Sequence, residues 1–92
     1  MPETKEIRLL LIEDDEGDAL LLKELLLGIG RVRLAGHVTS LGALRAAIIT
    51  AEPDVILMDL GLPDGSGLDS LRSAVELADA VTIVVLTGLD DE

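Results

Sequence analysis

Two acidic stretches contain the residues of this chain that could do chemistry. Glu13 and Asp14 belong to the run EDDE, which directly follows the apolar residues 7–12. Asp59 directly follows a second apolar run, VILM at 55–58, and precedes a loop rich in glycine and proline. Short unbroken apolar runs are typical of strands buried on both faces, as in a parallel sheet. Because ligands in open α/β sheets bind outside the carboxyl ends of the strands, carboxylates at these positions indicate a site.

The chemistry that these acids favour is the binding of a hard cation. If the two strands are parallel neighbours, Glu13, Asp14 and Asp59 meet at one rim of the sheet, where their oxygen atoms could share a divalent ion. The alternative is that the first acidic stretch caps the following helix and complements its dipole. That alternative fits Asp15, Glu16 and Asp18 better than it fits Glu13 and Asp14.

Apolar runs and helical patterns alternate along the chain. The runs suited to strands lie at 7–12, 32–38, 55–58 and 81–86, and the helical patterns lie at about 18–27, 41–50 and 68–77. This alternation is the sequence signature of right-handed βαβ units in a parallel sheet. We therefore expect one α/β domain over residues 1–92.

The spacing of apolar residues predicts which side of each helix faces the sheet. We expect Ser40 to cap the second helix, and Glu52 with Pro53 to end it. The residues expected to face inward are Leu21, Leu22, Leu25 and Ile29 in the first helix, Leu41, Leu44, Ala47 and Ile48 in the second, and Leu68, Leu71 and Val75 in the third.

The second strand pattern contains His37, the only histidine, and a second polar interruption at Arg33. Polar residues within an apolar strand favour an edge position over a central one. Nothing close to His37 in the sequence resembles a metal ligand or a nucleophile. We therefore interpret it as a surface residue of an edge strand.

Composition restricts the kinds of site and partner. The 92 residues are 49% hydrophobic with no aromatic residue, so the core must be aliphatic and small. The absence of cysteine excludes disulfides and thiolate metal sites. A net charge of −11, from 18 acidic and 7 basic residues, argues against a direct hold on nucleic acid, whose phosphates need clustered Lys and Arg. The acidic balance suits a divalent cation better, with ordinary solubility as the alternative.

The sequence contains no recognisable targeting segment. Its first residues, MPETKEIR, are polar, and no apolar stretch approaches the 18 residues of a membrane span. We therefore expect neither a signal peptide nor a membrane partner, and the expected compartment is the cytoplasm.

Four features in this order resemble the receiver domain of bacterial two-component response regulators. They are the acidic pair after the first strand, Asp59 after the third, the loop LGLPDGSG that follows it, and Thr87 at the end of the fourth strand. The resemblance implies a flavodoxin-like three-layer sandwich with strand order 2-1-3-4. The second and fourth strands would then lie at the edges of the sheet.

The resemblance also implies roles for individual residues. Asp59 matches the phosphoacceptor, and Thr87 matches the switch hydroxyl. Glu13 and Asp14 match the acidic pair that holds Mg²⁺ together with Asp59. Gly61 stands where the family offers a backbone carbonyl to the metal. The expected phosphoryl donor is a histidine kinase or a phosphotransfer protein.

The sequence departs from the family pattern after the fourth strand. The family continues with a helix, a fifth strand that ends in a lysine, and a last helix, none of which is present here. The only lysines, Lys5 and Lys23, lie in the wrong places to replace that lysine. We therefore expect a C-terminally truncated domain whose fourth strand, 81–86, has an unpaired apolar edge. Such edges pair with other chains, so we expect a homo-oligomer formed there.

Two other functions compete with phosphoacceptance. The first is a receiver-fold fragment that is not phosphorylated and serves as an interaction or self-assembly module. The second is a small hydrolase with Asp59 as nucleophile, which is disfavoured because Gly61 stands where a general acid would be needed. We do not expect an enzyme in the sense of a turnover catalyst.

Overall fold

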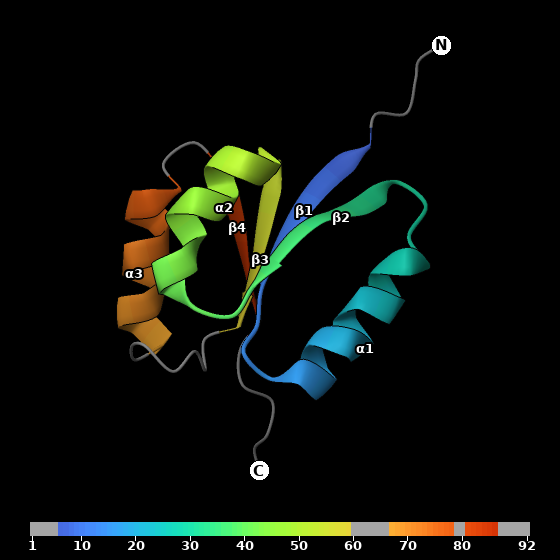
Figure 1. Cartoon of the computed structure of the whole chain (residues 1–92), viewed down its shortest axis with the longest axis horizontal. Coiled ribbons are helices and arrows are strands. Elements are labelled where there is room, and N and C mark those ends of the chain that lie inside the picture. Colours follow the sequence, from blue (N-terminus) through green and yellow to red (C-terminus); the bar gives the residue numbers. More distant parts are fainter. Residues whose placement is uncertain (1–5, 60–66, 79–80, 87–92) are drawn as a thin grey trace.

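The computed structural model describes the backbone of residues 6–59, 67–78 and 81–86 of the chain. Strands and helices alternate throughout these residues, as the sequence pattern predicts (Figure 1). A short 3-10 turn, η1 (Leu41–Ala43), leads into the second helix. The elements in order are β1 (Ile7–Ile12), α1 (Glu16–Leu27), β2 (Val32–Val38), α2 (Leu44–Ala51), β3 (Val55–Asp59), α3 (Gly67–Leu77) and β4 (Thr82–Leu86).

The four strands form one sheet in the order β2-β1-β3-β4, and every neighbouring pair is parallel. The predicted strand order is therefore confirmed, with β2 and β4 at its two ends. Helices α2 and α3 lie on one face of the sheet and α1 lies on the other (Figure 1). This is the flavodoxin-like three-layer sandwich expected from the sequence.

The core consists of two layers of aliphatic side chains, one on each face of the sheet. Leu10 and Ile12 of β1 and Ile56 and Met58 of β3 are completely buried on the face covered by α2 and α3. Leu9 and Leu11 of β1 are buried on the α1 face. Successive residues of a strand point to opposite faces, so a strand covered on both sides is apolar throughout.

The orientation of α1 differs from the one predicted. Ala19, Leu22 and Leu26 pack against the sheet, whereas Leu21 and Leu25 are 57% and 59% exposed. Ile29, also expected inside, is half exposed. Leucines surround most of this helix, so apolar spacing alone does not define one stripe. The small Ala19 determines the orientation, because its side chain allows the helix to approach the strands closely.

The second and third helices confirm the prediction only in part. Leu44 is fully buried, and the other three inward residues predicted for the second helix pack around it. In α3 the core residues are Ala74 and Leu77, followed by Ala78, whereas Val75 is 54% exposed. Favouring valine over alanine was wrong because the close approach of the helix to the sheet requires small side chains. Leu68 and Leu71 lie outside the residues whose side chains the structure describes.

The first turn of α2 differs from the prediction, whereas its last turn agrees with it. Ser40 makes no side-chain capping hydrogen bond, because the chain enters the helix through the 3-10 turn. The predicted Ser40 cap is therefore wrong. Glu52 ends the helix as expected, in the left-handed conformation with φ of 49°.

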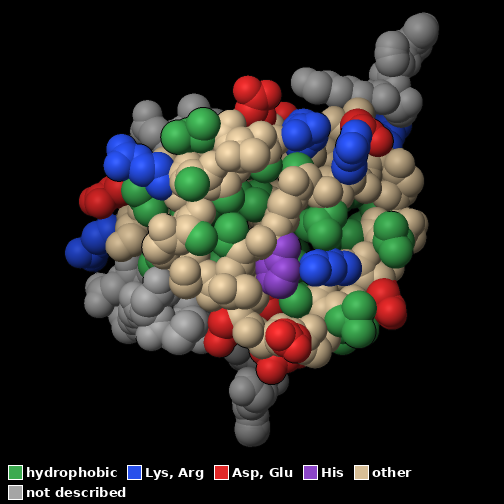
Figure 2. All heavy atoms as spheres, viewed as in Figure 1, with side chains coloured by type: hydrophobic (Ala, Val, Ile, Leu, Met, Phe, Trp, Pro, Cys, Tyr) green, Lys and Arg blue, Asp and Glu red, His purple; other side chains and the backbone are tan. Residues whose placement is uncertain are grey.

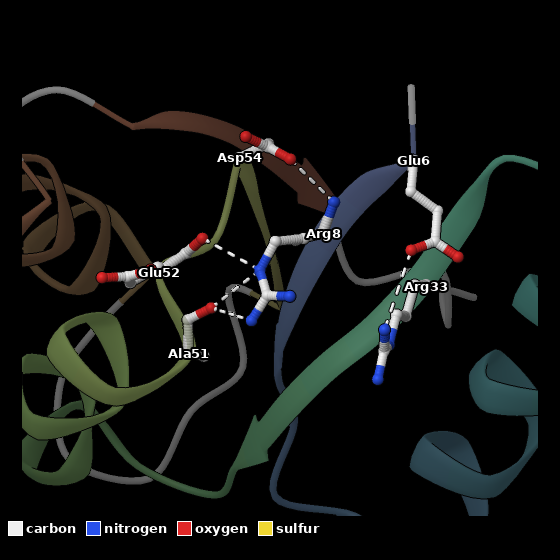
Figure 3. A network of polar contacts seen from close by, with 6 residues as sticks. All are labelled: Glu6, Arg8, Arg33, Ala51, Glu52 and Asp54. Carbon is white, nitrogen blue, oxygen red and sulfur yellow. Dashed lines mark hydrogen bonds and ion pairs between the residues drawn. The ribbon is translucent and has the colours of Figure 1, made fainter. Parts of the chain in front are cut away.

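Arg8 fastens the connection between α2 and β3 to the beginning of β1 (Figure 3). Its Nε donates to the backbone carbonyls of Ala51 and Glu52 at 3.0 and 3.2 Å. Its backbone N–H donates to Oδ2 of Asp54 at 2.8 Å. The helix end lacks partners for its last carbonyls within the helix, and Arg8 supplies them. This network lies at the amino ends of β1 and β3, whereas Glu13 and Asp59 lie at the carboxyl ends of these strands.

Candidate functional site

The carboxyl ends of β1 and β3 lie side by side at one edge of the sheet. Ile12 pairs with Met58 in the parallel register, so Glu13 and Asp59 are the next residues of two adjacent strands. Asp59 is the last residue of β3 and pairs with Leu86 of β4. The topology therefore brings the two acidic stretches of the sequence to the same edge.

Glu13 makes hydrogen bonds through its backbone N–H, its backbone carbonyl and its side chain. Its backbone N–H donates to the carbonyl of Val38 at 3.0 Å, and its own carbonyl lies 2.9 Å from Nε2 of His37. Its side chain is buried, with the residue 2% exposed, and Oε2 accepts the backbone N–H of Asp15 at 3.1 Å. A carboxylate removed from water needs such donors, since burial without hydrogen bonds is costly. The position of Glu13 is thus determined by the end of β2 and by the loop that begins α1.

The remaining acids of the first stretch lie at the surface and have different roles. Asp15 is the N-cap of α1, and its Oδ2 accepts the backbone N–H of Asp18 at 2.7 Å. The capping interpretation is therefore confirmed for Asp15. Asp14 is exposed and lies between the buried Glu13 and this cap.

Three parts of the predicted site lie outside the described residues: the side chain of Asp59, Gly61 and Thr87. Over residues 6–58, 72–78 and 81–85, whose side chains are described, no three His, Cys, Asp or Glu residues gather to form a metal site. The proposed set needs the carboxylate of Asp59 as its third member. The metal site therefore stays a prediction.

The donors that the structure does describe fit a hard cation in their chemistry. Glu13 and Asp14 offer carboxylate oxygens, which are the ligands that Mg²⁺ uses in proteins. They belong to consecutive residues at the edge where β3 also ends in an aspartate. The chain contains no cysteine, so no thiolate competes with these oxygen ligands.

His37 is the residue near the site that sequence reasoning missed. The predicted edge position is confirmed, because β2 lies at one end of the sheet. The ring is partly buried, however, and it is hydrogen-bonded to the Glu13 carbonyl, a contact that the sequence did not indicate. In Figure 2 the histidine reaches the surface directly beside a Lys or Arg side chain, and acidic side chains gather below it at the edge of the molecule. Its partner is a backbone atom 24 positions away in the sequence, directly after the end of β1, so no sequence motif could have indicated the contact.

Comparison with protein families decides the kind of domain that this edge belongs to. The family model described as the response regulator receiver domain matches residues 9–92. The chain belongs to the response regulator receiver domain family. The strand order, the acidic edge and the position of Asp59 at the end of β3 agree with this assignment.

Similar proteins extend the comparison. The receiver domain is 35% identical over 83 residues to the KDP operon transcriptional regulatory protein KdpE of Escherichia coli, covering 90% of this chain and 36% of the relative. It is 43% identical over 82 residues to KdpE of Mycobacterium tuberculosis, covering 89% of this chain and 36% of the relative. The chain thus spans about a third of the length of these regulators.

A solved structure shows the same fold. The signal receiver domain of the regulator NarL from Mycobacterium tuberculosis superposes with a TM-score of 0.76 at 20% identity, covering 95% of this chain and 70% of that one. Over the part of this receiver domain that the structure describes, no helix is both long and apolar enough to cross a bilayer.

Proposed function

We propose that this receiver domain takes part in two-component signalling by accepting a phosphoryl group on Asp59. The donor would be a histidine kinase or a phosphotransfer protein, and Mg²⁺ would be the cofactor. The observation that supports this most strongly is the register of β1 and β3, which makes Glu13 and Asp59 neighbours at the carboxyl edge of the sheet. Membership of the receiver domain family further supports the proposal.

The proposed reaction begins with attack of a carboxylate oxygen of Asp59 on the phosphorus of the donor. The bond from phosphorus to the donor's leaving group breaks, and an acyl phosphate forms on Asp59. When bound, Mg²⁺ would neutralise charge on the phosphoryl oxygens, held by Glu13, Asp14, Asp59 and the Gly61 carbonyl. Thr87 would donate a hydrogen bond to the phosphoryl group, a local contact that a mobile segment could convert into a signal.

Residues 1–92 would form one signalling domain, without turnover catalysis and without direct contact to DNA. The KdpE relatives are named as transcriptional regulators, but the chain spans only about a third of them. Its net charge of −11 opposes binding to a phosphate backbone. Any contact with DNA would therefore come from another part of a longer protein.

Phosphorylation can be tested with a small phosphodonor such as acetyl phosphate. The purified chain is incubated with the donor and Mg²⁺, and its intact mass is measured. We expect a mass gain of one phosphoryl group that disappears with a chelator and in Asp59→Asn. Asp18→Asn, at an exposed position of α1, is the matched control and should be phosphorylated like the parent. A parent that gains no mass would overturn the proposal.

A second candidate function, self-association, is favoured by the exposure of one half of the sheet. One row of side chains on the α1 face crosses three neighbouring strands: Leu11 of β1, Leu57 of β3 and Val84 of β4. Leu11 is 1% exposed, Leu57 is partly buried and Val84 is 46% exposed, so the side chains become more exposed toward β4. On the other face, Ile83 of β4 still packs against the core. No helix among the described residues covers Val84. We propose that a second copy meets this half of the sheet and the adjacent edge of β4, since parallel sheets are normally covered on both faces.

A further inference from the structure

We propose that His37 is a positioning residue for the acidic pair, fixing the backbone between Glu13 and Asp14. This inference rests on the proposed function, because it assigns His37 a task in holding the predicted Mg²⁺ ligands. It starts from the hydrogen bond between the His37 ring and the Glu13 carbonyl, whose length is 2.9 Å.

An irregularity in β2 directs the histidine toward this contact. Leu9 pairs with Leu34, but Leu10 pairs with Gly36, so the register shifts by one residue at Ala35. One extra residue in a strand moves every following side chain to the opposite face. Because of the shift, His37 pairs with Leu11 on the α1 face. Without it His37 would stand opposite Ile12 and point into the core between the sheet and α2.

The hydrogen bond continues the pairing of β1 with β2 by one residue beyond the end of β1. The backbone N–H of Glu13 already donates to the carbonyl of Val38, which is the last residue of the strand. The Glu13 carbonyl faces a side-chain donor from β2, the ring of His37. A carbonyl can only accept, so Nε2 of His37 carries the hydrogen. Both polar groups of the Glu13 backbone are thus tied to the end of β2.

The carbonyl of Glu13 belongs to the same planar peptide unit as the backbone N–H of Asp14. Fixing the direction of the carbonyl therefore fixes the plane from which Asp14 leaves the strand. Asp14 is exposed, and no hydrogen bond of its side chain appears among those described between residues 6 and 59. The backbone is then the means by which the fold can orient this carboxylate. Removing a hydrogen-bond partner that orients a metal ligand typically changes metal affinity by 10- to 100-fold.

The test compares Mg²⁺ affinity and phosphorylation in two variants of the full chain. His37→Leu removes the donor, and His37→Gln retains an amide N–H at a similar distance from the backbone. Mg²⁺ is titrated while backbone amide resonances are followed by NMR, and phosphorylation by acetyl phosphate is timed at low and at saturating Mg²⁺. We expect His37→Leu to raise the Kd for Mg²⁺ roughly tenfold. Its rate at saturating Mg²⁺ should stay close to that of the parent, and His37→Gln should recover most of the affinity.

Val32→Ala, at the other end of β2, is the control for a general weakening of this strand. It should lower thermal stability without changing the Kd. The inference is overturned if His37→Leu remains folded and binds Mg²⁺ as tightly as the parent, or if Val32→Ala weakens binding equally. A parent chain that binds no Mg²⁺ overturns the proposed metal site itself, and the role of His37 with it. The two failures are distinguished by the parent titration alone.

Discussion

The acidic residues of the run EDDE, at positions 13–16, have different structural roles although they are consecutive. Glu13 is buried because it directly continues β1, whose last residue, Ile12, is fully covered. Asp15 caps α1, and Asp14 between them faces solvent. The run EDDE could be recognised from the sequence as acids at a strand end. Which of them is buried and which caps the helix depends on where the strand stops, and the run itself does not indicate that residue.

Repulsion among the acids gives a prediction about Asp59→Asn. The substitution removes one negative charge from the edge where Glu13 and Asp14 lie, so it should raise the free energy of unfolding without metal by about 1 kcal/mol. If Mg²⁺ binds the folded state as proposed, it should stabilise the parent more than the variant. Thermal melts of both proteins with and without Mg²⁺ measure the two effects. If the melting temperature of the parent does not respond to Mg²⁺, the metal site is not formed.

Arg8 should contribute to stability and not to the acidic edge. Arg8→Met keeps much of the aliphatic stem but leaves the carbonyls of Ala51 and Glu52 without this donor. We expect a loss of about 1–3 kcal/mol in the free energy of unfolding, measured by urea denaturation. The control is Arg33→Met, which breaks an exposed ion pair with Glu6 at 3.7 Å and should cost under about 1 kcal/mol. Equal losses in the two variants would contradict the role given to Arg8.

At the scale of elements, the sequence indicated where helices and strands lie better than which way the helices face. The four strands and the alternation follow from apolar runs that only a doubly covered strand requires. The faces of α1 and α3 are determined by Ala19 and Ala74, small residues that allow close approach to the sheet. Hydrophobicity ranks leucine and valine above alanine. Apolar spacing therefore predicts core positions for Leu25 and Val75, and both are exposed.

The end of α2 gives a prediction about backbone strain. Glu52 has φ of 49°, a conformation that costs an L-residue about 1–2 kcal/mol and glycine almost nothing. After allowing for the flexibility of glycine in the unfolded chain, Glu52→Gly should raise the free energy of unfolding by about 0.5–1 kcal/mol. Glu52→Ala removes the same charge but keeps the strain, so it serves as the control in the same denaturation series. A glycine variant no more stable than the alanine variant would count against this assignment of strain.

On the scale of the whole molecule, the strand order determines what is gathered and what is left uncovered. The order β2-β1-β3-β4 makes β1 and β3 neighbours and brings their carboxyl ends together. Glu13 and Asp59, which are 46 positions apart in the sequence, therefore lie at the same end of the sheet. The sequence implied this order through its family resemblance. It could not show the contact of His37 with Glu13, which depends on the register shift in β2. The same order leaves β4 at the edge, with Val84 exposed on the α1 face.

The uncovered half of the sheet predicts self-association of the chain. Val84→Lys places a charge in the middle of that surface and should convert an oligomer into a monomer in sedimentation velocity experiments. Ile49→Lys, at an exposed apolar position of α2 on the other face, should leave the assembly intact. The charge of −11 on each copy opposes association, but charges farther apart than about 10 Å are largely screened at ordinary ionic strength. Sedimentation of the parent as a monomer at high concentration would rule this function out.

Locating the phosphoryl group on the chain is the most direct test of Asp59 as the phosphoacceptor. After incubation with acetyl phosphate and Mg²⁺, borohydride reduces an aspartyl phosphate to homoserine, which peptide mass spectrometry can assign to one residue. We predict homoserine at position 59 alone, and none when Mg²⁺ is removed. Homoserine at Asp14 or at any other aspartate, or an unmodified chain in the presence of Mg²⁺, would contradict the account.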